Sequence, residues 1–515
     1  MEPQSRNNSD HRSERGRSHF DHNNHQTHSQ YRNDRRSFDH SRNNDHNGYH
    51  RQRNSQSEQA DVQVEVGQRF PLTIKRLGIN GEGIGYYRHK ITFVPGALPD
   101  EVVVAEVTHV AAHFLNAKVH QIRKESDHRV TPPDTQSAEV GGFELSHLDY
   151  PSQLAFKRDV IRQALEKFQP RGWENYDLRP TIGMADPYHY RNKAQFQVRQ
   201  DADDNVIAGL YKEGTHDLVD LPEVSTQNEA TMTVIRALVK MLQELQVPIY
   251  DEEANSGIIK TLVVRSSEAS GEVQVTFVTN SQKLPHKREL LALIEERLPQ
   301  VVSVMQNVNQ SKTSLVWGDK TTKLMGQDYI TETLLGKQFQ LSPRAFLQLN
   351  PKQTTRLYEE TIKALDLTHA DHLVDAYSGV GTIGLSLADR AGEVRGMDTI
   401  EESVDDANRN AELNGITNAE YSVGTAEDLL PQWVSQGWRP DALVVDPPRA
   451  GLADTMIDTI MQVQPEKFVY VSCNPSTLAQ NLVELGRVYR VEYIQSIDMF
   501  PQTARVEAVV KLVLR

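Results

Sequence analysis

The stretch from His372 to Asp398 limits the fold of this chain more than any other part of the sequence. An apolar run, "HLVDAYS", leads into Gly379-Val-Gly381-Thr-Ile-Gly384 and then into a helix-forming segment. Glycine allows the backbone to turn sharply and to approach a ligand closely. A second strand-like run, "EVRGMD", ends at Asp398, about twenty residues further on, where a carboxylate can accept the hydroxyls of a ribose. The pattern predicts a doubly wound α/β domain that binds a nucleoside-containing cofactor, either NAD or S-adenosylmethionine.

Two further apolar runs end in polar motifs. "DALVV" is followed by Asp446-Pro447-Pro448-Arg449, and "KFVYV" by Ser472-Cys473-Asn474-Pro475. Ligands of open α/β sheets lie outside the carboxyl ends of the strands, so both motifs are expected to face the cofactor. A lone cysteine is more often a small buried hydrophobic residue, but a strand end before Asn-Pro favours presentation of the Cys473 thiol. The final strand-like run begins near Glu507, for which a solvated acid is the competing interpretation.

Composition excludes several classes of site. The 515 residues include 56 Lys and Arg, 70 Asp and Glu and one cysteine, with a net charge of −14. An RNA site must therefore be a local patch, and neither a disulfide framework nor a cysteine-based zinc or iron–sulfur site can form. No apolar run approaches the ~18 residues that span a bilayer, and the N-terminus lacks a signal-peptide core. We expect a cytoplasmic protein with no metal site, and nothing in the sequence indicates a protein partner.

The chain divides into four parts. Residues 1–60 contain no Leu, Ile or Val and hold 8 of the 19 histidines, which predicts a disordered tail, either an RNA-contacting arm or a solubilising segment. Residues 62–124 alternate short β-type runs with glycines and read as a small β-barrel. From Val66 to Lys124, eight Lys and Arg stand against four acids. With Tyr86, Tyr87 and Phe93 among them, this surface suits single-stranded RNA, unless these rings belong to the core.

Residues 125–340 read as a mixed α/β domain, and residues 341–515 as the catalytic domain. Apolar spacing predicts helices at about Tyr150–Phe168, Ala230–Gln246 and Lys287–Leu298. Strands are predicted in "NKAQFQVRQ", "IIKTLVVRSS" and "EVQVTFVTN". The basic, aromatic stretch "YHYRNKAQF" is interpreted either as an RNA contact or as an ordinary entry into a strand.

The motifs "DPPRAGL", "YVSCNPSTLAQNL" and "FPQTARVE", supported by "LSPRAFLQLNP", "DAYSGVGTIGL" and "YRNKAQF", resemble the TRAM-domain RNA (uracil-5-)-methyltransferases, especially the branch that modifies 23S ribosomal RNA. The resemblance covers about Val66 to the C-terminus. It implies a class I Rossmann-like methyltransferase domain behind a TRAM barrel. It also implies S-adenosylmethionine as cofactor, Cys473 as nucleophile, Glu507 as general base, and cofactor contacts from Gln348, Tyr377, Asp398 and Asp446, beside Gly379 and Gly381 of the glycine turn.

One departure from the family pattern concerns metal. Many relatives hold a four-iron, four-sulfur cluster through three cysteines in a Pro-Pro-Cys, x5, Cys-Gly-Gly-Cys pattern and a fourth further on. This chain has Asp134, Val140 and Phe143 at the first three places and Val224 near the fourth. The resemblance therefore places it in the cluster-free subgroup found among Gram-positive bacteria.

Three functions remain open from the sequence. The leading one is C5 methylation of uridines in 23S rRNA, and the second is the same chemistry on tRNA. The third is a catalytically silent RNA-binding or ribosome-assembly protein, against which the retained Cys473 and Glu507 argue. A nicotinamide oxidoreductase would account for the glycine turn but leaves the motifs at Asp446 and Cys473 without a role.

Overall fold

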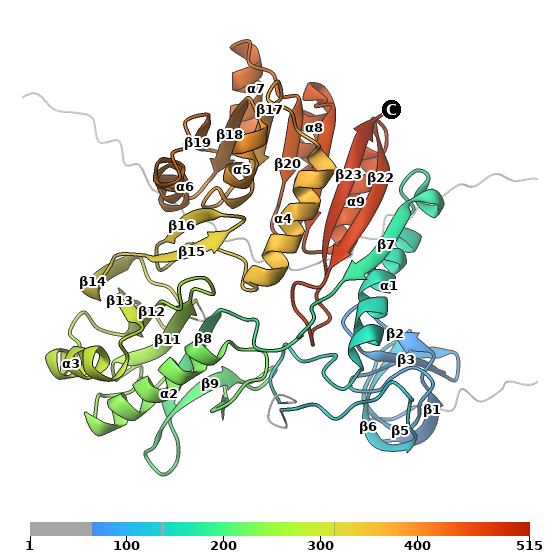
Figure 1. Ribbon diagram of the computed structural model, residues 1–515. Coiled ribbons are helices and arrows are strands. Elements are labelled where there is room, and N and C mark those ends of the chain that lie inside the picture. The colour runs from blue at the N-terminus through green and yellow to red at the C-terminus, as the bar shows by residue number, and fades with distance from the viewer. Residues whose placement is uncertain (1–63, 135–138, 314) are drawn as a thin grey trace, which may run out of the picture. The chain divides into compact units, whose positions relative to one another are not determined.

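The computed structural model describes residues 64–134, 139–313 and 315–515. The predicted tail, residues 1–60, lies outside them. The described strands form sheets of six, seven, two and eight strands (Figure 1). None of the described helices is long and apolar enough to cross a membrane.

The six-stranded sheet lies in the region of the predicted barrel and has the order β1-β5-β6-β4-β3-β2. Its strands are β1 (Arg69–Thr73), β2 (Arg76–Leu77), β3 (Gly83–Tyr87), β4 (Lys90–Val94), β5 (Val102–Val110) and β6 (Phe114–Lys124). Of the three aromatic residues expected to stack on bases, Tyr86 is 55% exposed. Tyr87 stacks on Phe70 with ring centroids 3.6 Å apart, and Phe93 packs edge-on against Phe114. Tyr86 is thus the best placed of the three to meet a base.

The seven-stranded sheet has the order β10-β9-β8-β11-β12-β13-β14. The strands are β8 (Lys193–Gln200), β9 (Val206–Tyr211), β10 (Leu218–Asp220), β11 (Ile259–Ser266), β12 (Val273–Thr279), β13 (Val301–Val308) and β14 (Lys320–Gly326). Two helices, α2 (Glu229–Glu244) and α3 (Lys287–Arg297), share its apolar core. The ends of α2 and α3 lie within two residues of those predicted, and β8, β11 and β12 lie in the predicted strand segments. The prediction succeeds here because the apolar spacing of these segments is regular. A short hairpin of β15 (Ile330–Leu334) and β16 (Lys337–Leu341) follows.

The eight-stranded sheet has the order β19-β18-β17-β20-β21-β23-β22-β7. Its strands are β7 (Asp177–Ile182), β17 (His372–Ala376), β18 (Glu393–Asp398), β19 (Ala419–Val423), β20 (Ala442–Val445), β21 (Lys467–Ser472), β22 (Tyr489–Ile497) and β23 (Glu507–Leu514). The run from β19 to β21 is parallel, and β23 is antiparallel to both of its neighbours. Strand order reverses between β17 and β20, and ligands of doubly wound folds bind at such a switch point.

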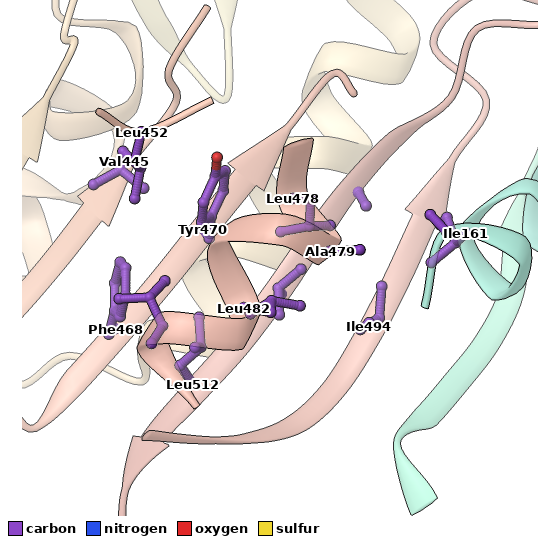
Figure 2. Close-up of a cluster of buried hydrophobic side chains, with 14 of the residues drawn as sticks. Ile161, Val445, Leu452, Phe468, Tyr470, Leu478, Ala479, Leu482, Ile494 and Leu512 are labelled. Carbon is purple, nitrogen blue, oxygen red and sulfur yellow. The ribbon is translucent and has the colours of Figure 1, made fainter. Parts of the chain in front are cut away.

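Side chains of β20 show why this sheet carries helices on both faces. All four residues of β20 are buried. Leu443 and Val445 join the apolar cluster that contains residues of α1 (Tyr150–Phe168), α8 (Asp454–Val463) and α9 (Pro475–Leu485), part of which Figure 2 shows. Ala442 and Val444 join the cluster on the other face, which contains residues of α4 (Pro351–Leu365), α5 (Thr382–Leu387) and α6 (Glu401–Leu413). Successive side chains of a strand point to opposite faces, so a strand covered on both faces is apolar throughout.

The first helix, α1, has the bounds predicted from the sequence. Its partner β7 belongs to the stretch 125–340, yet β7 pairs in parallel with β22 of the eight-stranded sheet. The chain therefore contributes to the catalytic sheet before the predicted boundary at 340. The division into parts at residues 62, 124 and 340 stays a prediction.

Candidate active site

The glycine turn follows β17 and carries the first group of predicted site residues. Gly379 and Gly381 have φ of +53° and +79°, a backbone conformation that favours glycine. A Cβ at Gly381 would also lie 2.9 Å from the ring of Tyr421. The amide of Gly379 donates to Oδ2 of Asp398, at the end of β18, over 3.0 Å. The structure thus brings Gly379, Gly381 and Asp398 together at the carboxyl edge of the sheet.

Each carboxylate oxygen of Asp398 accepts a hydrogen bond from a different backbone amide. Oδ2 accepts from Gly379, and Oδ1 accepts from Ile400 over 3.0 Å. An ionised carboxylate has about four acceptor positions. Asp398 is therefore oriented by the protein and still has the capacity to bind two hydroxyl groups. This arrangement fits the ribose of a nucleoside cofactor.

A buried acid beneath the glycine turn was missed by the sequence reasoning. Asp375, on β17, accepts the amide of Gly384 over 2.8 Å, and burial raises its pKa to about 7. A Cβ at Gly384 would lie 2.7 Å from Oδ2 of Asp375. The acid thus fixes the start of α5 and explains the third glycine of the motif. An acid inside an otherwise apolar strand is the sequence signal that could have identified Asp375.

Cys473 and Glu507 meet at the same edge, one from each of two neighbouring strands. In the antiparallel pair of β21 and β23, Ser472 lies opposite Ala508. Cys473 follows Ser472, and Glu507 precedes Ala508, so Cys473 and Glu507 are neighbours at the end of this pair of strands. Cys473 is partly exposed, whereas Glu507 is buried and its Oε2 has no hydrogen-bond partner among the described residues. The interpretation of Glu507 as a solvated acid is wrong.

The motifs after β20 and β21 are joined by a direct contact. The side-chain amide of Asn474 donates to the backbone carbonyl of Arg449 over 2.8 Å. The amide of Asp446 lies 3.4 Å from the carbonyl of Ala376 at the end of β17. Both motifs consequently lie at the same carboxyl edge of the sheet as the glycine turn.

Three acidic groups and two cations set the electrostatics at this edge of the sheet. Burial, together with the charges of Glu507 and Asp446, raises the pKa of Cys473 to about 12, against the opposing charge of Arg449. Burial raises the pKa of Glu507 well above its usual range, helped by Asp446 and opposed by Arg449 and Lys157. Burial also raises the pKa of Asp446 to about 7. These shifts favour the protonated forms of Cys473 and Glu507, and groups with such shifts are typical of active sites.

The loop from Asp498 to Val506 leads into Glu507 and is held by α1. Lys157, fully buried on α1, forms an ion pair with Asp498 and donates to the carbonyl of Phe500 over 2.8 Å. Tyr150 donates to the same aspartate over 2.9 Å. Gln153 exchanges hydrogen bonds with the side chain and backbone of Gln502. Sequence reasoning missed these contacts, because partners so far apart in the chain leave no local pattern.

The two remaining predicted residues are less closely tied to the others. Tyr377 follows β17 with φ of +64°, and burial and the charge of Glu427 raise its pKa to about 12. Gln348 is 8% exposed and lies between β16 and α4. The structure shows no hydrogen bond from Gln348 to another predicted site residue.

The four positions that the family resemblance assigns to cluster ligands lie in or near the apolar core of the seven-stranded sheet. Val140 and Val224 are buried in its apolar core, and Phe143 packs against that core. Asp134 accepts the amide of Ser225 over 2.9 Å. In the described parts of the chain, no group of three or more His, Cys, Asp or Glu is arranged to hold a metal ion. The cluster-free assignment stays a prediction.

A cavity of about 1070 Å³ connects the six-stranded sheet with the loop before Glu507. Its lining includes Phe93 and Phe114 from the sheet, Glu144, and Arg505 from the loop. The backbone amide of Ala504, which also lines the cavity, lies 3.3 Å from Oε2 of Glu144. The six-stranded sheet therefore borders the same loop that presents Glu507.

Comparison with known proteins identifies the family. Residues 149–515 match the family model of the tRNA (uracil-5-)-methyltransferases, and residues 63–120 match the TRAM domain. An RNA methyltransferase of Lactiplantibacillus plantarum is 66% identical over 89% of this chain and 95% of its own length. One of Enterococcus faecalis is 55% identical over 87% of this chain and 98% of its own length.

A solved structure extends the comparison to the fold. The tRNA (uracil-54, C5)-methyltransferase of Pyrococcus abyssi, in complex with S-adenosyl-L-homocysteine, matches with a TM-score of 0.69 and 27% identity. The match covers 86% of this chain and all of that one. This chain therefore belongs to the tRNA (uracil-5-)-methyltransferase family, S-adenosylmethionine-dependent enzymes that methylate RNA, and it carries a TRAM domain before its α/β methyltransferase fold.

Proposed function

We propose that this protein methylates C5 of specific uridines in 23S ribosomal RNA through a covalent bond between Cys473 and C6 of the base. One observation carries the proposal: the single thiol of the chain lies beside the buried carboxyl group of Glu507 at the ligand edge of the sheet. Neither residue is explained by packing alone, because Cys473 is partly exposed and one oxygen of Glu507 has no hydrogen-bond partner among the described residues.

S-adenosylmethionine, when bound, supplies an electrophilic methyl group. The residues assigned to hold it are Gln348, Tyr377, Gly379, Gly381, Asp398 and Asp446. Asp398 suits the ribose, since both of its oxygens are oriented by backbone amides and retain acceptor positions. The positive φ values of Gly379 and Gly381 allow the backbone to approach the ligand closely.

Cys473 is assigned as the nucleophile because C5 of uracil does not react with an alkylating group unaided. Addition of the thiolate to C6 converts the ring to an enolate whose C5 is nucleophilic. Cysteine suits this role, being the side chain that ionises to a strong nucleophile at the lowest energetic cost near neutral pH. The surroundings of Cys473 favour its protonated form. The thiol must therefore first lose its proton to solvent water, which its partial exposure allows.

Glu507 is assigned as the general base for the last step. After methylation, C5 still carries its hydrogen, which must be removed before the C5–C6 double bond re-forms and the thiolate leaves. A carboxylate within reach of C5 can accept this proton. The raised pKa of Glu507 makes its carboxylate a stronger base than an exposed glutamate.

RNA contacts outside the active site are expected from the TRAM domain. The cavity beside Arg505 and the exposed ring of Tyr86 offer a route for the strand that flanks the target. A base must leave its stack to reach Cys473, at a cost of a few kcal/mol that is smallest in loops. Contacts to the flanking nucleotides offset this cost.

A tRNA loop is the second candidate substrate, favoured by one observation. The solved relative from Pyrococcus abyssi acts on tRNA, and its match with this chain extends beyond residues 149–515. A domain arrangement of this kind is therefore compatible with a tRNA substrate. The preference for 23S rRNA rests on the family resemblance of the motifs.

Mapping 5-methyluridine in RNA from a strain that lacks the gene tests the proposal. We expect one or more 5-methyluridines to disappear from 23S rRNA, to return with the wild-type gene, and to stay absent with Cys473→Ala. Loss from tRNA alone would establish the second candidate. Unchanged 5-methyluridine in both RNAs would show that the proposed function is wrong.

A further inference from the structure

One face of the seven-stranded sheet is apolar and lies under α2, whereas the other carries one buried cation, Arg265, and the partly exposed Lys193. On β8, Ala194, Phe196 and Val198 belong to the core shared with α2, as do Leu262 and Val264 on β11. Because strand side chains alternate between faces, Lys193 and Arg265 point to the opposite face. They are also direct partners in the antiparallel ladder.

The two side chains therefore begin close together. Residues directly opposite each other in an antiparallel pair have Cβ atoms about 4.5–5.5 Å apart. The same cross-strand row continues to Gln274, which lies opposite Arg265, and to Ser303. A third cation, Arg191, precedes Lys193 by two residues. Burial and the charges of Arg265 and Arg191 lower the pKa of Lys193 to about 7.

These cations lack compensating partners among the residues that the structure describes. The side chains of Lys193 and Arg191 make no hydrogen bond or ion pair there. Arg265 is 3% exposed and donates from one nitrogen to the carbonyl of Ala345 over 2.6 Å. Its other terminal nitrogen, Nη1, is buried without a partner.

The nearest carboxylates are engaged elsewhere. Glu332 and Asp406 attract Arg265 electrostatically without forming an ion pair with it. Glu332 accepts the backbone amides of residues 268, 269 and 333, and Asp406 pairs with Arg409 over 2.7 Å. Buried charges in proteins are normally paired, because an uncompensated one is costly. This cluster therefore fits an anion that comes from a ligand.

The position of the cluster indicates which ligand. The amide of Asn192 donates to the carbonyl of Leu349 over 2.9 Å, so Asn192 and Arg265 hold the two ends of the segment that carries Phe346 and Gln348. Tyr190 donates to the carbonyl of Pro501, in the loop before Glu507, over 2.9 Å. Phe346 itself is 61% exposed. Arg265 thus contacts the segment that carries Gln348, and Tyr190, next to Arg191 in the sequence, contacts the loop that leads into Glu507.

We propose that Arg191, Lys193 and Arg265 form a binding site for a backbone phosphate of the RNA, next to the uridine that enters the active site. This inference rests on the proposed function and adds to it the group that fixes the RNA strand there. A phosphate is favoured over the carboxylate of the cofactor for two reasons. Three cations exceed what one carboxylate requires, and the residues assigned to the cofactor lie mainly at the carboxyl ends of β17, β18 and β20 of another sheet.

Salt-dependent RNA binding by the full-length protein tests the site. The probe is an RNA stem-loop that the wild-type enzyme methylates, and the variants are Lys193→Gln and Arg191→Gln. Each lost phosphate contact should reduce the slope of log Kd against log salt by about 0.7 and raise Kd about tenfold near 0.1 M salt. Lys193→Arg should retain most of the wild-type slope.

Lys240→Gln is the matched control, because Lys240 is an exposed cation of α2. Its slope and Kd should equal those of the wild type. Affinity for S-adenosylmethionine, measured by calorimetry, should be unchanged in all variants. Lower cofactor affinity with an unchanged RNA slope would assign the cations to the cofactor carboxylate and overturn the proposal.

Unchanged RNA binding by both folded variants would overturn it as well. If Lys193→Gln lowers the melting temperature, Arg191→Gln tests the phosphate site independently. Failure of the proposed function has a different signature, since the wild-type protein would then form 5-methyluridine in no RNA. Failure of the phosphate site appears only in the variants.

Discussion

At the scale of single residues, the thiol of Cys473 is held in its unreactive, protonated form. Burial raises its pKa most, followed by the charges of Glu507 and Asp446. Because the thiolate is the nucleophile, this environment disfavours reaction of the thiol at neutral pH. The chain has one cysteine, so any thiol reagent reports on this residue alone.

The first prediction concerns the titration of this thiol. The rate of alkylation of Cys473 by iodoacetamide should still rise with pH above about 9, because its raised pKa keeps the thiolate scarce at neutral pH. Glu507→Gln should shift the alkylation profile to lower pH, since it removes a carboxylate that disfavours the thiolate. Glu484→Gln, which removes an exposed acid of α9, should leave the profile unchanged. A plateau near neutral pH would contradict the described environment.

The second prediction concerns Asp398. Asp398→Ala should weaken the binding of S-adenosylmethionine by about 1.5–3 kcal/mol for each charge-assisted hydrogen bond lost, roughly ten- to a hundredfold in Kd. Isothermal calorimetry measures this directly. Asp405→Ala, an exposed acid on the neighbouring helix α6, is the control and should bind normally. Tight binding by Asp398→Ala would remove this residue from the cofactor site.

At the scale of secondary-structure elements, the cofactor edge depends on the close approach of β18 to β19. Gly396, on β18, lies opposite Tyr421 on β19, and a Cβ at Gly396 would come within 2.1 Å of the tyrosine ring. The ring also underlies the glycine turn, where Tyr421 contacts the carbonyl of Gly381 over 3.3 Å. One aromatic side chain thus fills the space under both segments.

The third prediction tests this packing. Gly396→Ala should force the ring of Tyr421 to move, which typically costs 1–3 kcal/mol in a well-packed core. Asp398 lies two residues further on, so cofactor affinity should fall together with the free energy of unfolding. Gly141→Ala, where a Cβ has no neighbour within 4 Å, should change neither. Unaltered stability of Gly396→Ala in urea unfolding would show that this contact is not constraining.

The extent to which the sequence predicted these elements follows from the range of the interactions. Helix α1 and the strand ends at Asp398, Asp446 and Cys473 follow from local apolar periodicity and from motifs, so they could be predicted. The ion pair of Lys157 with Asp498 joins residues 341 positions apart, so no local sequence pattern predicts it. The residues of β7 fall in the predicted central region, 125–340. Their place in the eight-stranded sheet depends on pairing with β22, which lies far away in the sequence.

At the scale of the whole molecule, an acidic chain must bind an acidic polymer. The net charge of −14 opposes association with RNA, so specific contacts have to come from local clusters. The seven-stranded sheet contributes Lys193 and Arg265, and the β21–β23 edge contributes Cys473 and Glu507. As proposed, the first pair binds a phosphate of the RNA and the second reacts with the target uridine, so methylation should require both pairs.

The most direct test of the central claim is the capture of the covalent intermediate. Glu507→Gln keeps the shape of the side chain but cannot accept the C5 proton, so thiol addition and methylation should proceed and release should stall. Incubated with substrate RNA and cofactor labelled in the methyl group, this variant should give a protein–RNA complex that survives denaturing electrophoresis and carries the label. The complex should be absent from the double variant Cys473→Ala, Glu507→Gln. Turnover of Glu507→Gln at the wild-type rate, with no trapped complex, would contradict the assignment of Glu507 as the base.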